Sequence, residues 1–387
     1  MTCWKSVRAV DFIEFNPHLN LKKGTIATKV AMDKLKPFTK KIPETEKAEF
    51  NGGAKFCNGD TLMARITPCL ENGKTAFIDF LDDGEVAFGS TEFIVMRAKA
   101  GISDPQFVYY TAINPTFRNV AIKSMVGSSG RQRVQQSVLE ELELSVPDLD
   151  EQRRIGAFLA RLDEKIALNN RINDNLQQQA FSVFDNLIAN AENNDYTVSD
   201  YAFLNPKRTL AKNQVARSID MSQLSTSGAF PSGWEMKPFN GGMRFTNGDT
   251  LLARITPCLE NGKTAFIDFL DDGEVAFGST EYIVLAPKND TPPEMLYCLA
   301  RYPAFVDYAV KNMNGSSGRQ RVSAETVGQY RLPLFDKHSL VLFKEVVSPM
   351  FLKMRYNSLE NMRLAELRDA LLPKLMSGEI DVSAVQL

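Results

Sequence analysis

Two long stretches of the chain space their hydrophobic residues three and four positions apart, which is the pattern of one helical face. The first covers 151–190 and the second covers 337–376. A helix of about 40 residues is ~60 Å long at ~1.5 Å per residue, which is too long to lie on one small domain. We therefore expect two long helices that project and pack together as a coiled coil.

The two hydrophobic stripes coincide at an offset of 188 residues. Asparagines then fall at matching positions, Asn169 with Asn357 and Asn173 with Asn361. A polar Asn inside a hydrophobic seam often fixes the register of a helix pair. The alternative is two amphipathic helices buried separately, each on its own domain. The expected seam residues are Leu159, Leu162, Ile166, Asn169, Ile172, Leu176, Val347, Met350, Met354, Asn357, Leu364 and Leu371.

Outside these stretches the chain alternates between short strand-like and short helical segments. TAFIDFLDDGEVAFGSTEFIVM at 75–96 alternates and is interrupted by Asp-Asp-Gly, which predicts a hairpin. PQFVYYTAINPTFRNVAIKSM at 105–125 is helical in pattern and is broken at Asn114-Pro115. The fold class is therefore α/β. We expect globular domains at 1–150 and 191–336, long helices at 151–190 and 337–376, and a tail at 377–387.

The globular domains are two copies of one plan. Residues 58–96 and 247–285 differ at three of 39 positions, with an offset of 189. GSSGRQRV occurs at 127–134 and again, unchanged, at 315–322. The segments that precede these blocks, 1–49 and 190–238, have diverged. An internal repeat of this kind predicts two similar domains and an internal pseudo-twofold arrangement.

Composition excludes several classes of protein. No apolar run approaches the ~20 residues that cross a bilayer, and the N-terminal residues lack the apolar core of a signal peptide, so we expect a cytoplasmic protein. The five cysteines and two histidines show no metal or redox spacing, and we expect no metal. The net charge is −2, so any surface for nucleic acid must come from local segregation of charge.

The repeated TPCLENGKTAF ends like a phosphate-binding loop, but the resemblance fails at two points. The first glycine of that loop is replaced by Pro68, and by Pro257 in the repeat, and proline has no N–H to donate to a phosphate. The residues after Gly-Lys-Thr alternate like a strand and do not open a helix. We interpret Asn72-Gly73 as a tight turn between strands. A duplicated NTP-binding enzyme and a coiled-coil adaptor remain the alternative functions.

In this order the motifs resemble the specificity subunit of type I restriction–modification systems. The resemblance rests on NGDTLLARITPCLENGKTAFIDFL, GSSGRQRV, EQRRIGAFLARLDEKIALNNRINDNL and the ending LRDALLPKLMSGEI. It implies two target-recognition domains that each recognise half of a split DNA site, and two antiparallel spacer helices. It also implies partner methyltransferase (modification) subunits that bind S-adenosylmethionine and methylate adenine N6, and restriction subunits that use ATP and Mg. This chain itself would hold no catalytic residue and no cofactor.

The GSSGRQRV loops are the expected contacts with double-stranded DNA. Small residues allow a close approach, Ser hydroxyls and amides can bind phosphate, and Arg and Gln can contact base edges. The first loop supplies Ser128, Ser129, Gly130, Arg131, Gln132 and Arg133, with Lys123 before it. Its repeat supplies Ser316, Ser317, Gly318, Arg319, Gln320 and Arg321, with Lys311 before it. The alternative is a flexible, solvated loop with a charged tip.

The near-identical block is mostly acidic and is expected to be scaffold. Its exceptions as candidate DNA contacts are Arg65, Asn72 and Lys74, with the repeats Arg254, Asn261 and Lys263. Most other lysines and arginines lie in the diverged segments and are expected to face phosphate or solvent. If identical loops contact the two half-sites, the recognised sequence is an interrupted palindrome.

Overall fold

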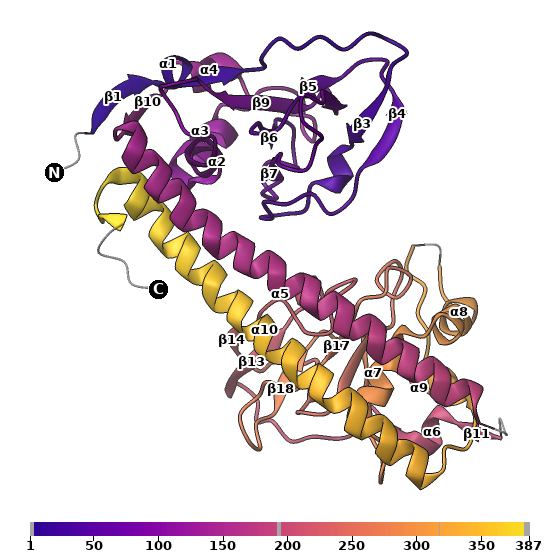
Figure 1. The fold of residues 1–387 in the computed structure, drawn as a ribbon. Helices are drawn as coiled ribbons and strands as arrows, with labels where there is room; N and C mark the ends of the chain where they lie inside the picture. The colour runs from indigo at the N-terminus through magenta and orange to yellow at the C-terminus, as the bar shows by residue number, and fades with distance from the viewer. Residues whose placement is uncertain (1–3, 192–194, 317, 383–387) are drawn as a thin grey trace. The chain divides into compact units, whose positions relative to one another are not determined.

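The computed structural model describes residues 4–191, 195–316 and 318–382. The chain divides into two compact units (Figure 1). The first consists of residues 1–167 with 364–387, and the second consists of residues 168–363. Each unit therefore holds one globular domain, part of the long helix that follows it and part of the other long helix.

The first domain has two four-stranded sheets and one two-stranded sheet, with strand orders β2-β9-β6-β7, β4-β3-β8-β5 and β1-β10. The pairing is antiparallel except between β3 and β8, which are parallel. Its strands are β1 Lys5–Arg8, β2 Ile13–Phe15, β3 Ile26–Val30, β4 Glu46–Glu49, β5 Ala54–Phe56, β6 Thr61–Ala64, β7 Thr75–Phe77, β8 Ala87–Gly89, β9 Phe93–Ala98 and β10 Glu143–Val146. Its helices are α1 Ala9–Phe12, η1 Met32–Lys34, α2 Pro105–Ile113, α3 Pro115–Lys123, α4 Gln136–Glu140 and α5 Leu149–Ala189.

The second domain repeats this topology, with sheets β12-β19-β16-β17, β14-β13-β18-β15 and β11-β20. Its strands are β11 Tyr196–Thr197, β12 Ala202–Leu204, β13 Val215–Ile219, β14 Glu235–Pro238, β15 Met243–Phe245, β16 Thr250–Ala253, β17 Thr264–Phe266, β18 Ala276–Gly278, β19 Tyr282–Pro287 and β20 Arg331–Leu332. Its helices are α6 Val198–Tyr201, η2 Met221–Gln223, α7 Pro293–Arg301, α8 Pro303–Lys311, α9 Ala324–Gly328 and α10 Lys337–Ser377. The repeat seen in the sequence is thus a repeat of the fold, including segments whose sequences have diverged.

Local sequence explains the break between α2 and α3. Proline opens each helix, where its missing N–H leaves no hydrogen bond unmade. The Asp104 side chain caps α2 by accepting from Phe107 N, and the Asn114 side chain caps α3 by accepting from Thr116 N. The predicted break at Asn114-Pro115 is therefore confirmed.

The hairpin expected at Asp-Asp-Gly is wrong. Strand β7, before the turn, pairs with β6, whereas β8, after it, joins β3 and β5 in the other sheet. A local turn signal cannot distinguish a return along the same sheet from a crossing to another one. The turn at Asn72-Gly73 does connect a hairpin, because it lies between the antiparallel strands β6 and β7, with Gly73 at φ 73°.

The long helices α5 and α10 lie side by side and antiparallel within each unit (Figure 1). In the first unit, Leu159 and Leu162 of α5 share one core with Leu372 and Leu375 of α10 and with α2. Leu364 and Leu371 pack against that core. The seam is therefore also part of a domain core, and the helix pair does not project free of the domains.

In the second unit, Val347 and Met354 are buried in the main core, and Leu176 and Met350 pack against it. Asn169 and Asn357 are 1% exposed, while Ile166 and Ile172 are half-buried. The alternative of helices buried on separate domains is wrong, since both units contain parts of both helices.

Candidate nucleic-acid interface

The GSSGRQRV loop of the first unit is a hairpin with an anchored base and an exposed tip. Val126 and Arg133 form an antiparallel bridge, and Thr67 N donates to the Gln132 carbonyl at 3.0 Å. At the tip, Arg131 N donates to Ser128 O at 3.0 Å. Residues 127–131 are exposed, with glycines at left-handed φ at both ends of the Ser-Ser pair. The backbone thus presents Ser128, Ser129, Gly130 and Arg131 to solvent on a fixed base.

The repeated loop has the same anchors. Asn314 bridges Arg321, and Thr256 N donates to the Gln320 carbonyl at 3.0 Å. Ser316, Gly318 and Arg319 are exposed. Ser317, the remaining predicted contact of this loop, lies outside the described residues.

The second arginine of each loop is held by a glutamate. Arg133 donates to both carboxylate oxygens of Glu92, with Nε–O distances of 3.0 Å and an Nη2–Oε1 distance of 2.6 Å. Arg321 makes the same fork on Glu281, with Nε–O distances of 2.9 Å and an Nη2–Oε1 distance of 2.6 Å. The hydrogen bonds from arginine hold the pKa of both glutamates below the usual value. Such a bidentate pair fixes the guanidinium plane.

The first arginine of each loop is not held. Arg131 and Arg319 are exposed and make no ion pair with the described residues. Gln132 and Gln320 are half-buried, and only their backbone is engaged. The two arginines of one motif therefore differ in freedom, which the motif alone does not reveal.

Arg65 lies directly beside the ion pair between Glu92 and Arg133. Its backbone N donates to Glu92 O at 2.9 Å, and its carbonyl accepts from Val134 N at 2.8 Å. The Nε of Arg65 is buried and has no hydrogen-bond partner among the described residues, and the same holds for Arg254. The structure thus brings Arg65, Gln132 and Arg133 together, and likewise Arg254, Gln320 and Arg321.

The Gly-Lys-Thr turn does not form a phosphate cradle. The Lys74 ammonium donates to the Met32 carbonyl at 2.9 Å, and Lys263 donates to the Met221 carbonyl at 2.7 Å. The amides of Gly73 and Lys74 donate to Leu70 O and Cys69 O. Thr75 begins strand β7, so no helix N-terminus follows the turn. In both units the lysine braces a neighbouring segment, while Asn72 and Asn261 are exposed.

Other positive charges are paired only in part. Lys311 forms an exposed i,i+4 pair with Asp307 at 2.6 Å, while Lys123 is exposed and has no ion-pair partner among the described residues. In the diverged segments, several of the residues expected to face phosphate or solvent form ion pairs with carboxylates, namely Lys29, Lys34, Lys41, Arg208, Arg217 and Lys237. Lys22, Lys23, Lys36, Lys207 and Lys212 make no ion pair with the described residues.

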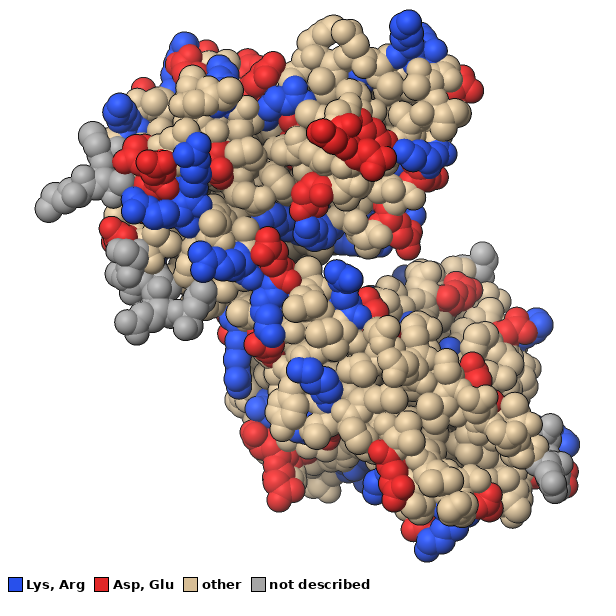
Figure 2. Space-filling model, in the orientation of Figure 1, with Lys and Arg blue, Asp and Glu red and all other residues tan. Residues whose placement is uncertain are grey.

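These ion pairs place acidic groups beside many of the basic ones. Figure 2 shows Lys and Arg interspersed with Asp and Glu over the face drawn. Sequence reasoning missed Glu92 and Glu281 as members of the site, because they lie 41 and 40 residues from their arginines. The available signal was that Glu92, Arg133 and their repeats are all unchanged between the two copies.

Comparison with known proteins shows which family the chain is similar to. Residues 47–178 match the type I restriction modification DNA specificity domain. The chain is 24% identical to the specificity subunit of the type I restriction enzyme HindI of Haemophilus influenzae, over 83% of this chain and 86% of that one. It is 33% identical to the EcoAI specificity subunit of Escherichia coli, over 35% of this chain and 21% of that one.

The fold is that of a solved specificity subunit. The crystal structure of the S subunit of a type I restriction–modification system from M. genitalium covers 97% of this chain, with a TM-score of 0.56 and 16% identity. In its matched domain, in its sequence relatives and in its fold, the chain is similar to type I restriction–modification specificity subunits, which agrees with the resemblance found in the sequence.

Two further observations concern the described residues alone. No helix among them is both long enough and apolar enough to cross a membrane. Within the same residues, no group of three or more His, Cys, Asp and Glu side chains is arranged to hold a metal ion.

Proposed function

We propose that this chain is the DNA-recognition subunit of a type I restriction–modification complex and that each unit recognises one half of a split site. The observation that carries this proposal is the duplicated loop. Arg131 and Arg319 occupy equivalent exposed positions on equivalent anchors, and each adjoins a second arginine fixed by glutamate. Arginine and glutamine are suited to bidentate contacts with guanine and adenine.

The structure supports a division of labour within each loop. Arg131 and Gln132 contact base edges, while Ser128, Ser129 and the glycine-rich backbone contact phosphate. Arg65, whose Nε lacks a partner, contacts a phosphate at the base of the loop. Arg133 is a positioning residue, because its guanidinium is held by Glu92. The equivalent residues of the second unit do the same.

Equivalent contacts on both half-sites give an interrupted palindrome as the recognised sequence. Two modification subunits bind the helix-pair region, methylate adenine N6 and carry S-adenosylmethionine, and restriction subunits carry ATP and Mg. The chain itself is non-catalytic, holds no cofactor and acts in the cytoplasm. Its role is to position these partners on DNA.

The experiment is single-molecule mapping of N6-methyladenine in cells that carry this chain with its methyltransferase partner. A split palindromic motif that depends on the chain is expected. Replacing Arg131→Ala together with Arg319→Ala should relax one base position in each half-site, at about 1–3 kcal/mol per contact. Arg8→Ala, which removes an exposed arginine of β1, is the matched control. A motif that does not depend on the chain would refute the function. An unchanged motif in the double variant would refute only the assignment of the loop.

A further inference from the structure

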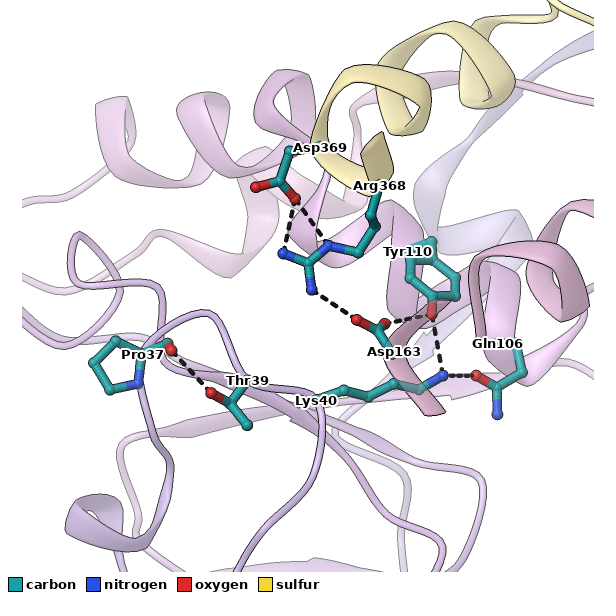
Figure 3. Close-up of polar contacts among 8 residues, drawn as sticks. All are labelled: Pro37, Thr39, Lys40, Gln106, Tyr110, Asp163, Arg368 and Asp369. Atoms are coloured by element: carbon teal, nitrogen blue, oxygen red, sulfur yellow. Dashed lines mark hydrogen bonds and ion pairs between the residues drawn. The ribbon is translucent and has the colours of Figure 1, made fainter. Parts of the chain in front are cut away.

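A chain of buried polar side chains connects the first domain to both long helices (Figure 3). Lys40 Nζ donates to Gln106 Oε1 at 2.5 Å and to the Tyr110 hydroxyl at 3.2 Å. That hydroxyl donates to Asp163 Oδ2 at 2.6 Å, and Arg368 Nη1 donates to Asp163 Oδ1 at 2.6 Å. Lys40, Asp163 and Arg368 are 5%, 7% and 8% exposed. The domain, α5 and α10 are thus joined by charges that are almost entirely removed from water.

The repeat identifies the equivalent positions in the second unit. The Lys40 carbonyl accepts a hydrogen bond from Phe77 N in the first unit. The Ala229 carbonyl accepts the equivalent bond from Phe266 N in the second unit, so these two residues correspond. Tyr110 and Cys298 are the sixth residues of α2 and α7, two nine-residue helices that begin with proline. Helices α5 and α10 both have 41 residues, so their positions can be matched directly. Asp163 is fifteenth in α5, and Arg368 is thirty-second in α10. Ala229 is therefore the equivalent of Lys40, and Cys298 is the equivalent of Tyr110. Phe351 corresponds to Asp163, and Ala180 corresponds to Arg368.

All four positions of the network are therefore apolar in the second unit. These residues are at most 5% exposed and belong to one hydrophobic core, in which Phe351 packs edge-on against Phe266 and Tyr297. The same fold is thus built with an apolar set at this place. Burying an ion pair is often no more stabilising than well-packed apolar residues of similar volume. A buried polar network can instead determine which partner is accepted.

The bonds between asparagines at the centre of the helix pair do not provide such selection. Asn169 and Asn357 are both twenty-first in their helices, and Asn173 and Asn361 are both twenty-fifth. Asn169 Nδ2 donates to Asn361 Oδ1 at 2.9 Å, and Asn357 Nδ2 donates to Asn173 Oδ1 at 2.8 Å. Both bonds join a twenty-first to a twenty-fifth position. Two copies of α5, paired antiparallel in this register, would therefore keep these two amide bonds and lose the bond from Asn169 Nδ2 to Glu360 Oε2, because α5 has Ile172 at the position of Glu360.

We infer that the Asp163–Arg368 pair, with Lys40 and Tyr110, selects the helix partner: it fits α5 to the C-terminal part of α10 and rejects a second copy of α5. In a pair of two α5 helices, Asp163 would face Ala180 and have no arginine beside it. In a pair of two α10 helices, Arg368 would face Phe351. In the first wrong pair Asp163 keeps Tyr110 but loses its arginine, and in the second Arg368 keeps only the more exposed Asp369. Removing one partner of a buried ion pair is strongly disfavoured. A single buried polar contact is known to set partner and register in helix pairs.

The test uses the full chain with a thiol placed near the centre of the α5 seam. Ile172→Cys puts a half-buried thiol at the twenty-fourth position, close to its own copy if two α5 helices pair. The chain is unfolded in urea, refolded at several concentrations and mildly oxidised. Disulfide dimers are then measured on non-reducing gels, and mass is measured by light scattering. The same chains without Ile172→Cys give the background from the native cysteines.

Two variants remove the selection. The first carries the residues of the second unit, Lys40→Ala, Tyr110→Cys, Asp163→Phe and Arg368→Ala. The second is the milder Asp163→Asn with Arg368→Gln. The control is Asp150→Asn with Arg153→Gln, which removes an exposed ion pair from the same helix, 83% and 59% exposed at the two side chains. Wild type and control are expected to remain monomeric, and both variants should raise the dimer fraction by about tenfold, equivalent to about 1.4 kcal/mol.

Equal dimer fractions in folded variants and wild type would overturn the inference, as would wild-type chains that form these dimers at the variant level. Failure of both variants to fold, measured by circular dichroism, would also overturn it, because the network would then be required for the fold.

Discussion

The Glu92 carboxylate holds the Arg133 guanidinium in a fork across 41 residues of sequence. The same relationship recurs between Glu281 and Arg321 in the second unit. Each glutamate lies at the start of a long central strand, β9 or β19, and each arginine closes the anchored base of a loop. A glutamate beside a DNA-contacting loop repels phosphate, so its presence favours a role in positioning the loop.

Replacing Glu92→Gln together with Glu281→Gln should release both loop arginines. Because the pairs are partly exposed, unfolding free energy should fall only slightly. Removing two negative charges should raise affinity for non-specific DNA, while the methylation motif becomes less strict. Methylation mapping and urea unfolding measure the two effects. A strict motif at unchanged stability would show that the fork does not position the loop.

Replacing Arg65→Met together with Arg254→Met should weaken binding to all DNA sequences alike. An arginine that binds phosphate carries no base information, so the motif should be kept. The slope of log binding constant against log salt should fall in magnitude by about 1 for each phosphate that the variant no longer binds. Binding titrations of the assembled complex at several salt concentrations measure this slope. A relaxed motif with an unchanged slope would instead assign these arginines to bases.

Much of the fold was accessible from sequence because its signals are periodic or repeated. The helices predicted at 151–190 and 337–376 correspond to α5 at Leu149–Ala189 and α10 at Lys337–Ser377. The internal repeat predicted two similar domains, and their strand orders agree. The hairpin predicted at Asp-Asp-Gly was wrong because β8 pairs with β3 and β5, which are distant in the sequence. A local turn motif carries no information about such long-range pairing.

The candidate site was less accessible for the same reason. The sequence indicated an Arg-Gln-Arg loop, but which arginine is free depends on Glu92, far along the chain. Lysine is a residue type that often binds phosphate, yet the Lys74 ammonium donates a hydrogen bond to a main-chain carbonyl of η1. The buried charge of Lys40 was invisible, since a lysine in a lysine-rich segment is usually solvated.

Two glycines beside the sheets test the packing of each domain. Gly53, at φ 114°, has no room for a side chain, because an added Cβ would overlap the carbonyl oxygen of Gly89. A Cβ added at Gly242 would likewise overlap the carbonyl oxygen of Gly278. Gly53→Ala should lower unfolding free energy by about 4 kcal/mol or more, since the backbone must shift. Gly84→Ala is the matched control, with φ 73° and open space around it, and should cost about 1–2 kcal/mol. Urea unfolding of the two variants measures the difference, and equal losses would contradict the steric explanation.

Removing one member of the buried Asp163–Arg368 ion pair should lower the unfolding free energy more than removing both members. Arg368→Met leaves the Asp163 carboxylate buried without its arginine and should cost about 3–5 kcal/mol of unfolding free energy. Asp163→Leu with Arg368→Met should restore much of that stability, because the second unit packs apolar residues at these positions. Denaturant titrations of the single and double variants measure the coupling. A double variant that is less stable than Arg368→Met would contradict it.

Lys40 should make stability depend on alkaline pH. Burial lowers the pKa of Lys40 to about 8 from 10.5, so the folded chain loses this proton before the unfolded chain does. Between about pH 8 and 10.5 the unfolded state therefore binds more protons, and unfolding free energy rises with pH. At about 1.4 kcal/mol per pKa unit, the full rise is at most about 3.5 kcal/mol. Other lysines and tyrosines titrate in the same range, so the relevant quantity is the difference between wild type and Lys40→Met. That difference should grow in favour of wild type from pH 8 to pH 10 in denaturant titrations. A constant difference would show that the Lys40 ammonium keeps its ordinary pKa in the folded chain.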